Sequence, residues 1–303
     1  MVASRGMKIL FGRLLLTLLG RLPPAGQRVL AGVVASAVWR TGWRKLEIVR
    51  ANLARAFPGT SAAERERLAR ANTRAMLQTL FECGSIWHRP APWIDDRIVR
   101  VIGREHLEQA QRQGRGVLLL GGHLGNWELT ILYGSLTLPV AFLYKPPRSA
   151  RLDRLLTGYR ARFGATMIPT GGPALRRALR QLRDGGAVGL LFDQLPRGGD
   201  HVDAPFFGVP AATMTLPHRL VRATGCAVVM GHCLRTADGR GWRVRIDPVP
   251  GADDPDPVVA ATAMNRALEA VVRDAPEQYL WHYRRFERLE TGSARERCRT
   301  GGG

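Results

Sequence analysis

Short β-like runs, several of them wholly apolar, alternate with segments of helical spacing from about residue 98 onward, and this alternation limits the fold more than any other feature of the sequence. Two of the runs, residues 117–120 and 188–192, contain only apolar residues and glycine, so neither face of such a strand would suit water. Strands buried on both faces are typical of parallel sheets that helices cover on both sides. The sequence therefore predicts an α/β fold with a mainly parallel central sheet flanked by helices. The expected strands are 117–120, 140–144, 166–168, 188–192, 227–230 and 242–246, and the expected helices are 104–112, 126–136, 150–163, 173–183, 214–224 and 257–274.

The first 60 residues are both apolar and basic. Two apolar runs, residues 9–19 and 29–39, are separated by two prolines, and residues 1–60 hold ten Lys and Arg residues against a single acid. Neither run reaches the length of about 18 residues that indicates a membrane span, and Arg13 interrupts the first run, which argues against a cleaved signal peptide. Arginine-flanked apolar helices are typical of segments that lie in an anionic membrane surface. We expect residues 1–60 to be a membrane-associated helical segment; the alternative is an amphipathic helical hairpin packed on the domain.

The remainder of the chain is expected to form one α/β domain, residues 61–290, followed by a flexible tail, residues 291–303, that ends in three glycines. Ser61 and Glu64 have the spacing of a capping box, which predicts that a helix begins there and runs to about Trp87. No internal repeat is visible, so the sequence does not predict a solenoid or an array.

The charge balance points to an acidic partner. The chain has 45 Lys and Arg residues against 25 Asp and Glu residues, a formal net charge of +20. Such an excess favours nucleic acid, anionic lipid headgroups, phosphorylated substrates or an acidic carrier protein, although a GC-rich coding sequence would also enrich arginine. Nucleic acid fits least, because aromatic residues make up 7% of the chain and no strand interleaves them with basic residues for base stacking. The four cysteines show neither zinc-site spacing nor a disulfide framework, which indicates a reducing compartment.

A candidate catalytic segment follows the apolar run 117–120. Two glycines and then His123 come directly after this run, where open α/β sheets bind their ligands. Glu128 falls in the first turn of the next expected helix, so its carboxylate is expected to orient the imidazole and make His123 a general base. The backbone N–H groups of Gly125 and Asn126, at the start of that helix, are expected to stabilise an oxyanion. The alternative is a structural histidine beside a carboxylate.

Six blocks, spread in order over roughly residues 10–290, resemble those of a known family. With them the chain resembles the bacterial lipid A biosynthesis acyltransferases, which transfer late acyl chains to a lipopolysaccharide precursor. The blocks are Gly122-His123-Leu124-Gly125-Asn126-Trp127-Glu128, Tyr144-Lys145-Pro146, Arg160-Ala161-Arg162-Phe163-Gly164, Asp193-Gln194, Phe206-Phe207-Gly208, and Pro276-Glu277-Gln278-Tyr279-Leu280-Trp281 with Arg284-Arg285-Phe286.

The sequence departs from the family pattern at three positions. Lys145 stands where the family usually has Arg, so that a bidentate contact becomes a point charge. Tyr283 replaces the usual His and Glu287 the usual Lys in the closing block. We therefore assign no catalytic role to the closing block from the resemblance.

The resemblance implies transfer of a fatty acyl group from acyl carrier protein to a hydroxyl of a phosphorylated glycolipid, at the cytoplasmic face of the inner membrane and without a metal or redox cofactor. It also implies substrate-binding residues. Arg160 is expected to support acyl transfer or to grip a phosphate. Asp193 follows the run 188–192 and is expected to orient the site or pair with an arginine, with capping of the turn 195–199 as the alternative. The expected substrate-binding set is Lys145, Arg160, Arg162, Asp193, Phe206 and Phe207, the two phenylalanines lining an acyl channel unless they are core residues.

Residues 145–183 carry ten cations against one acid, Asp153. This basic segment suits phosphates or an acidic carrier protein, and a solvated helix face is the alternative reading of any single arginine in it. The acceptor stays open at this stage: another membrane lipid, such as a phosphatidylinositol mannoside, a lysophospholipid or an aminolipid, would suit the same site. A basic nucleic-acid-binding protein is the remote alternative.

Overall fold

A computed structural model describes residues 2–195 and 200–287 of the chain. The predicted tail, residues 291–303, and most of the predicted turn 195–199 lie outside these residues. The helices are α1 (Val2–Arg21), α2 (Pro24–Arg40), α3 (Lys45–Ala56), α4 (Ala62–Ile86), α5 (Ala91–Asp95), α6 (Arg104–Arg112), α7 (Trp127–Thr137), α8 (Ala150–Arg160), α9 (Ala174–Arg183), α10 (Leu216–Thr224) and α11 (Pro257–Asp274), with short 3-10 turns at Ala161–Phe163 and Pro276–Gln278. The strands are β1 (Ile98–Ile102), β2 (Val117–Gly121), β3 (Val140–Tyr144), β4 (Thr166–Pro169), β5 (Ala187–Leu191), β6 (His201–Phe206), β7 (Val209–Met214), β8 (Ala227–Arg235) and β9 (Trp242–Pro248).

Seven strands form the central sheet in the order β1-β9-β8-β2-β5-β3-β4, and β6 pairs with β7 in a separate hairpin. Neighbouring strands are parallel except for β8 and β9. β2 lies near the middle, in register with β5 on one side and β8 on the other. The predicted α/β fold with a mainly parallel sheet is therefore confirmed, and the carboxyl ends of β2 and β5 lie next to each other at one edge.

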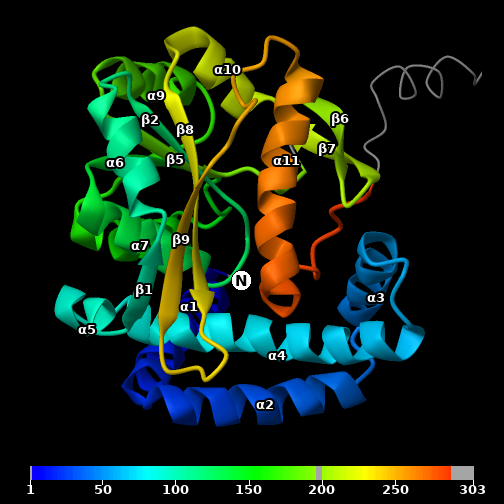
Figure 1. Cartoon of the computed structure of the whole chain (residues 1–303). Coiled ribbons are helices and arrows are strands. Elements are labelled where there is room, and N and C mark those ends of the chain that lie inside the picture. The colour runs from blue at the N-terminus through cyan, green and yellow to red at the C-terminus, as the bar shows by residue number, and fades with distance from the viewer. Residues whose placement is uncertain (1, 196–199, 288–303) are drawn as a thin grey trace, which may run out of the picture.

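Helices cover both faces of this sheet (Figure 1). Along β2, Leu118 and Leu120 face a core that α9, α10 and α11 complete, whereas Val117 and Leu119 face a second core with α6 and α7. All four side chains are buried. A strand that is buried on both faces has no place for an alternating polar residue, which explains the unbroken apolar runs in the sequence.

Each strand and helix predicted beyond residue 98 is present, but β1, β6 and β7 were missed. β1 is an edge strand in which two of its five residues are exposed, including Arg100, so its apolar signal is weak. The β6–β7 hairpin contains prolines at both Pro205 and Pro210, which depress any strand prediction. The predicted capping box is confirmed, since the Ser61 side chain accepts the N–H of Glu64 and the Glu64 carboxylate accepts the N–H of Ser61.

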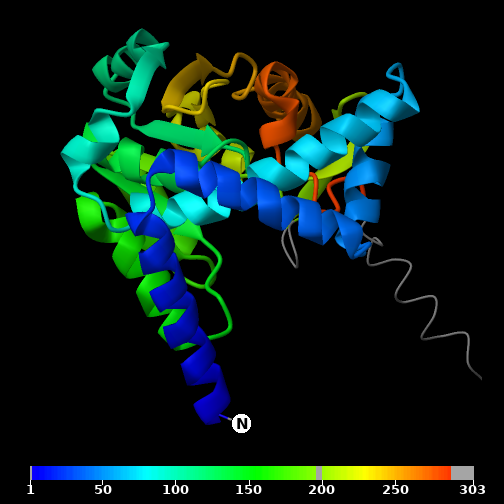
Figure 2. The ribbon, with the colours of Figure 1, turned by 90° about the horizontal axis from the view of Figure 1, so that it is seen from below.

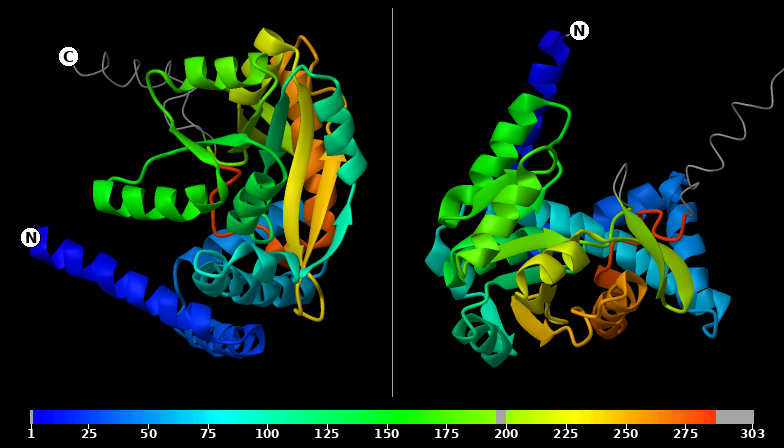
Figure 3. Two further views of the ribbon diagram at one scale, coloured as in Figure 1. Left: turned by 90° about the vertical axis from the view of Figure 1, so that its left-hand side faces the viewer. Right: turned by 90° about the horizontal axis from the view of Figure 1, so that it is seen from above.

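The N-terminal helix crosses α4 at a very close backbone contact. A Cβ atom built on Gly20 would lie 2.2 Å from the carbonyl oxygen of Gly84, so this crossing needs glycine. Gln27 strengthens it by donating to the Leu19 carbonyl at 2.7 Å and to the Ser85 hydroxyl at 2.8 Å. Beyond the crossing, α1 projects from the body of the protein, and α8 extends to the same side (Figures 2 and 3).

The projecting part of α1 carries exposed apolar side chains. They are Leu10, Phe11, Leu14, Leu15 and Leu18. On the next helix, Val29 and Val33 are also exposed. Within the part of the chain that the structure describes, no helix is long and apolar enough to cross a membrane.

Candidate active site

His123 lies directly beyond the carboxyl end of β2, in a tight segment that leads into α7. The segment is fixed by Gly125, which has a positive φ of 63° and lies so close to β8 that a Cβ atom would meet the Cys233 carbonyl oxygen at 2.2 Å. Only glycine adopts this conformation without strain and fits this approach. The His123 side chain is 16% exposed, so it is held by the protein and still reaches the surface.

The imidazole of His123 pairs with the carboxylate of Asp193, which follows the neighbouring strand β5. Nδ1 lies 2.7 Å from Oδ1 of Asp193, and the backbone N–H of His123 donates to Oδ2 at 2.8 Å. Asp193 is 2% exposed. Burial alone would raise the pKa of Asp193, but the charge and hydrogen bonds of His123, together with the charge of Arg285, outweigh burial and hold that pKa below its usual value. Asp193 thus contacts the candidate base, and its expected role in orienting the site stays a prediction.

The second ring nitrogen of His123 faces Gln194. Its Nε2 lies 3.1 Å from Nε2 of the Gln194 amide. Because Asp193 is an ionised acceptor, the Nδ1 proton points to it, which leaves Nε2 as the acceptor of the Gln194 N–H. In this tautomer the lone pair that a general base needs is on Nε2, the ring nitrogen beside Gln194.

The predicted contact between Glu128 and His123 is wrong. The Glu128 carboxylate, 4% exposed, instead accepts hydrogen bonds from Nε of Arg160 at 2.9 Å and from Nη2 of Arg160 at 2.5 Å. The indole of Trp87 donates to it at 3.3 Å. Both nitrogens of the imidazole are already engaged by Asp193 and Gln194, so Asp193 holds the place that helical spacing suggested for Glu128.

The predicted oxyanion donors are also wrong. The N–H of Gly125 donates to the Gln278 carbonyl at 3.0 Å, and the N–H of Asn126 donates to the Cys233 carbonyl at 2.8 Å. Both groups are consumed because the segment after His123 folds against the end of β8 and against the turn Pro276–Gln278. A backbone N–H that is already bonded to a carbonyl cannot stabilise a developing negative charge.

A buried polar network that the sequence analysis missed holds this segment. The amide of Asn126 donates to one oxygen of Glu82 at 2.8 Å, and Arg235 donates to the other at 2.6 Å. Gln278 accepts the N–H of Arg235 at 2.9 Å and donates to its carbonyl at 3.2 Å. The network joins α4, α7 and β8 behind the histidine, and a buried, fully paired set of this kind fixes one geometry. No local sequence pattern marks it, since its members lie on four separate segments.

Among the described residues, no hydrogen bond or ion pair joins His123 to Lys145 or Arg162, two other expected substrate-binding residues. Lys145 is exposed just beyond β3. Arg162 donates to the Ile86 carbonyl at 3.1 Å and lies over the ring of Phe163. Their predicted contacts with substrate stay predictions.

Phe206 and Phe207 are core residues. They are 0% and 7% exposed and pack with Phe57, Tyr279 and Trp281. Phe207 also has a positive φ of 53°, and Glu269 accepts its N–H at 2.7 Å. Neither phenylalanine lines a cavity described in the structure, and the predicted acyl channel stays a prediction.

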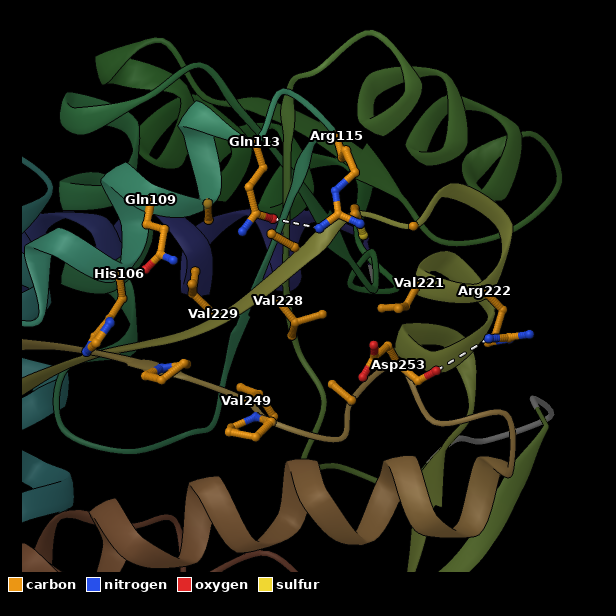
Figure 4. Close-up of a pocket in the computed structure, with 17 residues that line it drawn as sticks. His106, Gln109, Gln113, Arg115, Val221, Arg222, Val228, Val229, Val249 and Asp253 are labelled. Atoms are coloured by element: carbon orange, nitrogen blue, oxygen red, sulfur yellow. Dashed lines mark hydrogen bonds between the residues drawn. The ribbon is translucent and has the colours of Figure 1, made fainter.

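A cavity of about 490 Å³ lies at the opposite edge of the sheet, among α6, α10, β8 and β9 (Figure 4). His106, Arg115 and Arg222 are among the side chains at its rim. Arg115 lies just before β2, and Ala227 is the first residue of β8. This cavity is therefore at the amino ends of these two strands, whereas His123 follows the carboxyl end of β2. We do not assign it to the reaction.

Comparisons with known proteins identify the family of the chain. Residues 3–288 match the family described as bacterial lipid A biosynthesis acyltransferase. The lipid A biosynthesis palmitoleoyltransferase of Escherichia coli K12 is 35% identical over 83% of this chain and 81% of its own length, and the lauroyltransferase of the same organism is 32% identical over 82% and 81%. A phosphatidylinositol mannoside acyltransferase of Mycobacterium tuberculosis H37Rv is 30% identical over 67% and 65%. The match over nearly the whole chain shows that this protein belongs to the bacterial lipid A biosynthesis acyltransferases and is an acyltransferase.

Proposed function

We propose that the protein moves a fatty acyl group from an acyl carrier protein thioester to a hydroxyl of a phosphorylated glycolipid, the lipid A precursor. The observation that carries this proposal is the His123–Asp193 pair, in which an ionised carboxylate accepts from Nδ1 and leaves Nε2 as an acceptor. Acyl transfer to a hydroxyl needs such a base and does not need an enzyme nucleophile, because the acceptor oxygen attacks the thioester itself. No metal or redox cofactor enters this scheme.

In the proposed reaction, Nε2 of His123 takes the proton of the acceptor hydroxyl while that oxygen attacks the thioester carbonyl. The new C–O bond forms and the C–S bond breaks, and the imidazolium returns the proton to the departing thiolate. Asp193 fixes the tautomer and stabilises the imidazolium, as its two hydrogen bonds to His123 suggest. The Gln194 amide is displaced from Nε2 when the hydroxyl binds.

Glu128 and Arg160 take a different part in the proposal. Their bidentate pair joins the first turn of α7 to the last turn of α8, so it fixes the basic helix α8 relative to the loop of His123. Arg151 and Arg154 are exposed on α8, and Arg176, Arg177 and Arg180 are exposed on α9. These cations suit an acidic carrier protein or the phosphates of the acceptor.

We further infer that the protein works at the cytoplasmic face of the inner membrane, bound through its N-terminal helices. The exposed leucines and Phe11 on the projecting part of α1 are apolar side chains that water alone would not favour. Arg13 lies among them and Arg21 follows them, and both suit anionic headgroups. The close crossing at Gly20 and Gly84 ties this apolar arm firmly to the catalytic domain.

A second acceptor class follows from the comparisons. The mycobacterial relative is named for acylation of a phosphatidylinositol mannoside, which is also a phosphorylated glycolipid. The acceptor hydroxyl of either lipid would meet the same base. We therefore keep phosphatidylinositol mannoside as the alternative acceptor, and the experiment below separates the two.

The test is an initial-rate assay of the full chain in anionic vesicles, with acyl-acyl carrier protein as donor and either a lipid A precursor or a phosphatidylinositol mannoside as acceptor. Product mass identifies the acyl group and the acceptor together. We expect transfer to the lipid A precursor, a rate at least about 10²-fold lower for His123→Gln, and cosedimentation of the protein with the vesicles that weakens when residues 1–40 are removed. Transfer to the mannoside alone would replace the acceptor, and an active His123→Gln variant would contradict the mechanism.

A further inference from the structure

The backbone of the His123 loop is fully occupied by internal hydrogen bonds. Attack on a thioester carbonyl puts negative charge on its oxygen, and a donor aimed at that oxygen speeds acyl transfer. Every backbone N–H from Gly122 to Asn126 is already bonded, so this stretch does not supply the donor. In chain order, these groups donate to Nε2 of His232 at 3.2 Å, to Oδ2 of Asp193 at 2.8 Å, and to the carbonyls of Gly122, Gln278 and Cys233 at 2.8, 3.0 and 2.8 Å.

The side chain of Gln194 brings a hydrogen-bond donor to the reacting end of the imidazole. Its amide nitrogen lies 3.1 Å from Nε2 of His123, the atom proposed to take the proton of the acceptor hydroxyl. A hydroxyl bonded to Nε2 has its oxygen about 3 Å away, and the carbonyl carbon that this oxygen attacks lies about 3–3.5 Å farther on. The carbonyl oxygen therefore acquires its charge within a short side-chain movement of the amide, whose nitrogen carries two N–H groups.

The backbone on both sides of Gln194 is anchored. Before it, the buried Asp193 carboxylate accepts the backbone N–H and Nδ1 of His123 at 2.8 and 2.7 Å. After it, the N–H of Leu195 donates to the Tyr283 hydroxyl at 2.9 Å. The half-buried Gln194 side chain can thus turn while its backbone stays in place. A donor on a fixed backbone needs little reorganisation during the reaction, which is the condition for strong stabilisation of a transition state.

Trp127 is a rival donor, because its indole also carries an N–H and lies beside the imidazole. The two ring centroids are 5.3 Å apart. In the described part of the chain, however, no hydrogen bond joins this indole to the imidazole, whereas the Gln194 amide makes one at Nε2. The contact at Nε2 favours Gln194.

We propose that Gln194 is a catalytic residue: its amide covers Nε2 of His123 in the free enzyme and, once the acceptor hydroxyl displaces it, donates an N–H to the thioester carbonyl oxygen. The proposal rests on the proposed role of His123 as base. As the acceptor oxygen forms the new C–O bond, its proton goes to Nε2 and the C=O electron pair moves onto the carbonyl oxygen, where the amide stabilises it. When the C=O bond re-forms, the C–S bond breaks and the imidazolium gives its proton to the thiolate.

The first test measures kcat and KM of the full chain and its Gln194 variants in the vesicle assay, with acyl-acyl carrier protein and the lipid A precursor. Gln194→Ala should lower kcat by about 10²–10³-fold with KM nearly unchanged, because the contact forms only in the transition state. Gln194→Glu keeps the shape without an N–H to donate and should lose at least as much, whereas Gln194→Asn keeps the amide and should recover part of the rate. Gln111→Ala is the matched control: it removes the same side chain from an exposed position on α6 and should behave as the parent protein.

A second measurement ties the loss to the carbonyl oxygen. A dithioester donor has sulfur in place of that oxygen, and sulfur is a weak hydrogen-bond acceptor. If Gln194 donates to the oxygen, the dithioester and Gln194→Ala remove the same interaction, so their effects on kcat/KM should be strongly non-additive. Additive effects would show that the amide acts elsewhere and would overturn the proposal.

Other outcomes of the first test would overturn it as well. An unchanged or faster Gln194→Ala enzyme would show that the amide only blocks Nε2 in the free enzyme. A raised KM with the parent's kcat would assign Gln194 to ground-state binding of substrate. A parent-like Gln194→Ala with a strongly impaired Trp127→Phe would move the donor to the indole. Melting curves of each variant exclude unfolding as the cause. In all these cases a slow His123→Gln enzyme leaves the proposed function standing, whereas an active His123→Gln enzyme would contradict that function's mechanism itself.

Discussion

Two buried carboxylates lie beside the loop between β2 and α7, and they are bound in different ways. Asp193 accepts the backbone N–H and Nδ1 of His123 at 2.8 and 2.7 Å, whereas Glu128 accepts Nε and Nη2 of Arg160 at 2.9 and 2.5 Å. The acids are 2% and 4% exposed, so burial does not separate them. Their partners do.

The difference in partner decides what each pair is able to do. An imidazole takes up and releases a proton near neutral pH, whereas a guanidinium stays charged at any pH that a folded protein tolerates. The His123–Asp193 pair is therefore suited to moving a proton, whereas the Glu128–Arg160 pair joins α7 to α8 and is proposed here to be structural. Four sets of substitutions test this contrast, from the largest expected effect to the smallest.

Loss of the imidazole should have the largest effect. A positioned general base contributes about 10²–10⁴-fold in rate, so His123→Ala and His123→Gln should both lower the initial rate of acyl transfer by at least about 10²-fold. Glutamine does not rescue the rate, because an amide bonds to a hydroxyl without accepting its proton at neutral pH. Melting curves serve as the control. Full activity of His123→Gln with a lowered melting temperature in His123→Ala would identify a structural histidine.

Loss of the carboxylate charge at Asp193 should have the next largest effect. In Asp193→Asn the amide still accepts one hydrogen bond but no longer stabilises the imidazolium or enforces the tautomer, so we expect a loss of about 10²-fold in kcat. Residues that act as one unit are not additive. The double variant His123→Gln/Asp193→Asn should accordingly be little slower than His123→Gln alone, and additive losses would show that Asp193 acts elsewhere.

The sequence predicted the strand that each member of the first pair follows, but not that the two residues meet. The apolar runs before His123 and Asp193 placed both at carboxyl ends of strands, and these ends adjoin because β2 pairs with β5. Strand order is a property of the whole sheet, and 70 residues separate the two side chains, so no local pattern reports it. Gln194 was visible beside Asp193 only as part of a motif.

Helical spacing misled the prediction for Glu128 because it places a side chain on a turn without fixing its direction. The residue lies in the first turn of α7, as expected, yet its carboxylate reaches Arg160, 32 residues farther along the chain. The same limit applies to Glu82, Arg235 and Arg285, whose buried charges meet partners from distant segments. Burial of polar groups is invisible in a sequence when their neighbours are unknown.

The region around Asp193 should also lose folding stability in acid. His232 lies behind it, and burial lowers its pKa to about 4 from 6.5. Between these two values the unfolded chain binds the proton and the folded chain does not, so the stability contributed by neutral His232 is present above about pH 6.5 and is lost as the pH falls toward 4. The loss amounts to about 3 kcal/mol at most.

Denaturant unfolding between pH 7 and 4 measures this contribution. His232→Gln keeps an acceptor for the Gly122 N–H and has no titrating ring, so its free energy of unfolding should fall less on acidification than that of the parent protein. His106→Gln is the control, since the His106 side chain is 37% exposed. Part of the decrease in the free energy of unfolding between pH 7 and 4 should persist in both variants, because burial also lowers the pKa of His282 to about 4. Identical pH dependence in His232→Gln and the parent would assign the acid response to other groups.

The smallest expected effect belongs to the Glu128–Arg160 pair, and it falls on stability. Removing one partner of a buried ion pair costs about 3–5 kcal/mol when both ions are fully enclosed. The Arg160 side chain is 18% exposed, so water relieves part of this cost and we expect about 2 kcal/mol for Glu128→Gln at neutral pH. Arg160→Gln should cost a similar amount, whereas Arg180→Gln, at an exposed position on α9, should cost almost nothing.

A double-mutant cycle then decides which partner Glu128 has. If the pair is structural, Glu128→Gln/Arg160→Gln should be more stable than the sum of the single variants predicts, because no unpaired charge stays buried. The same cycle run between Glu128→Gln and His123→Gln should give additive effects on unfolding, since the structure gives each imidazole nitrogen another partner. Strong coupling of Glu128 to His123, with none to Arg160, would restore the pairing that helical spacing suggested and would place the proton chemistry on the other carboxylate.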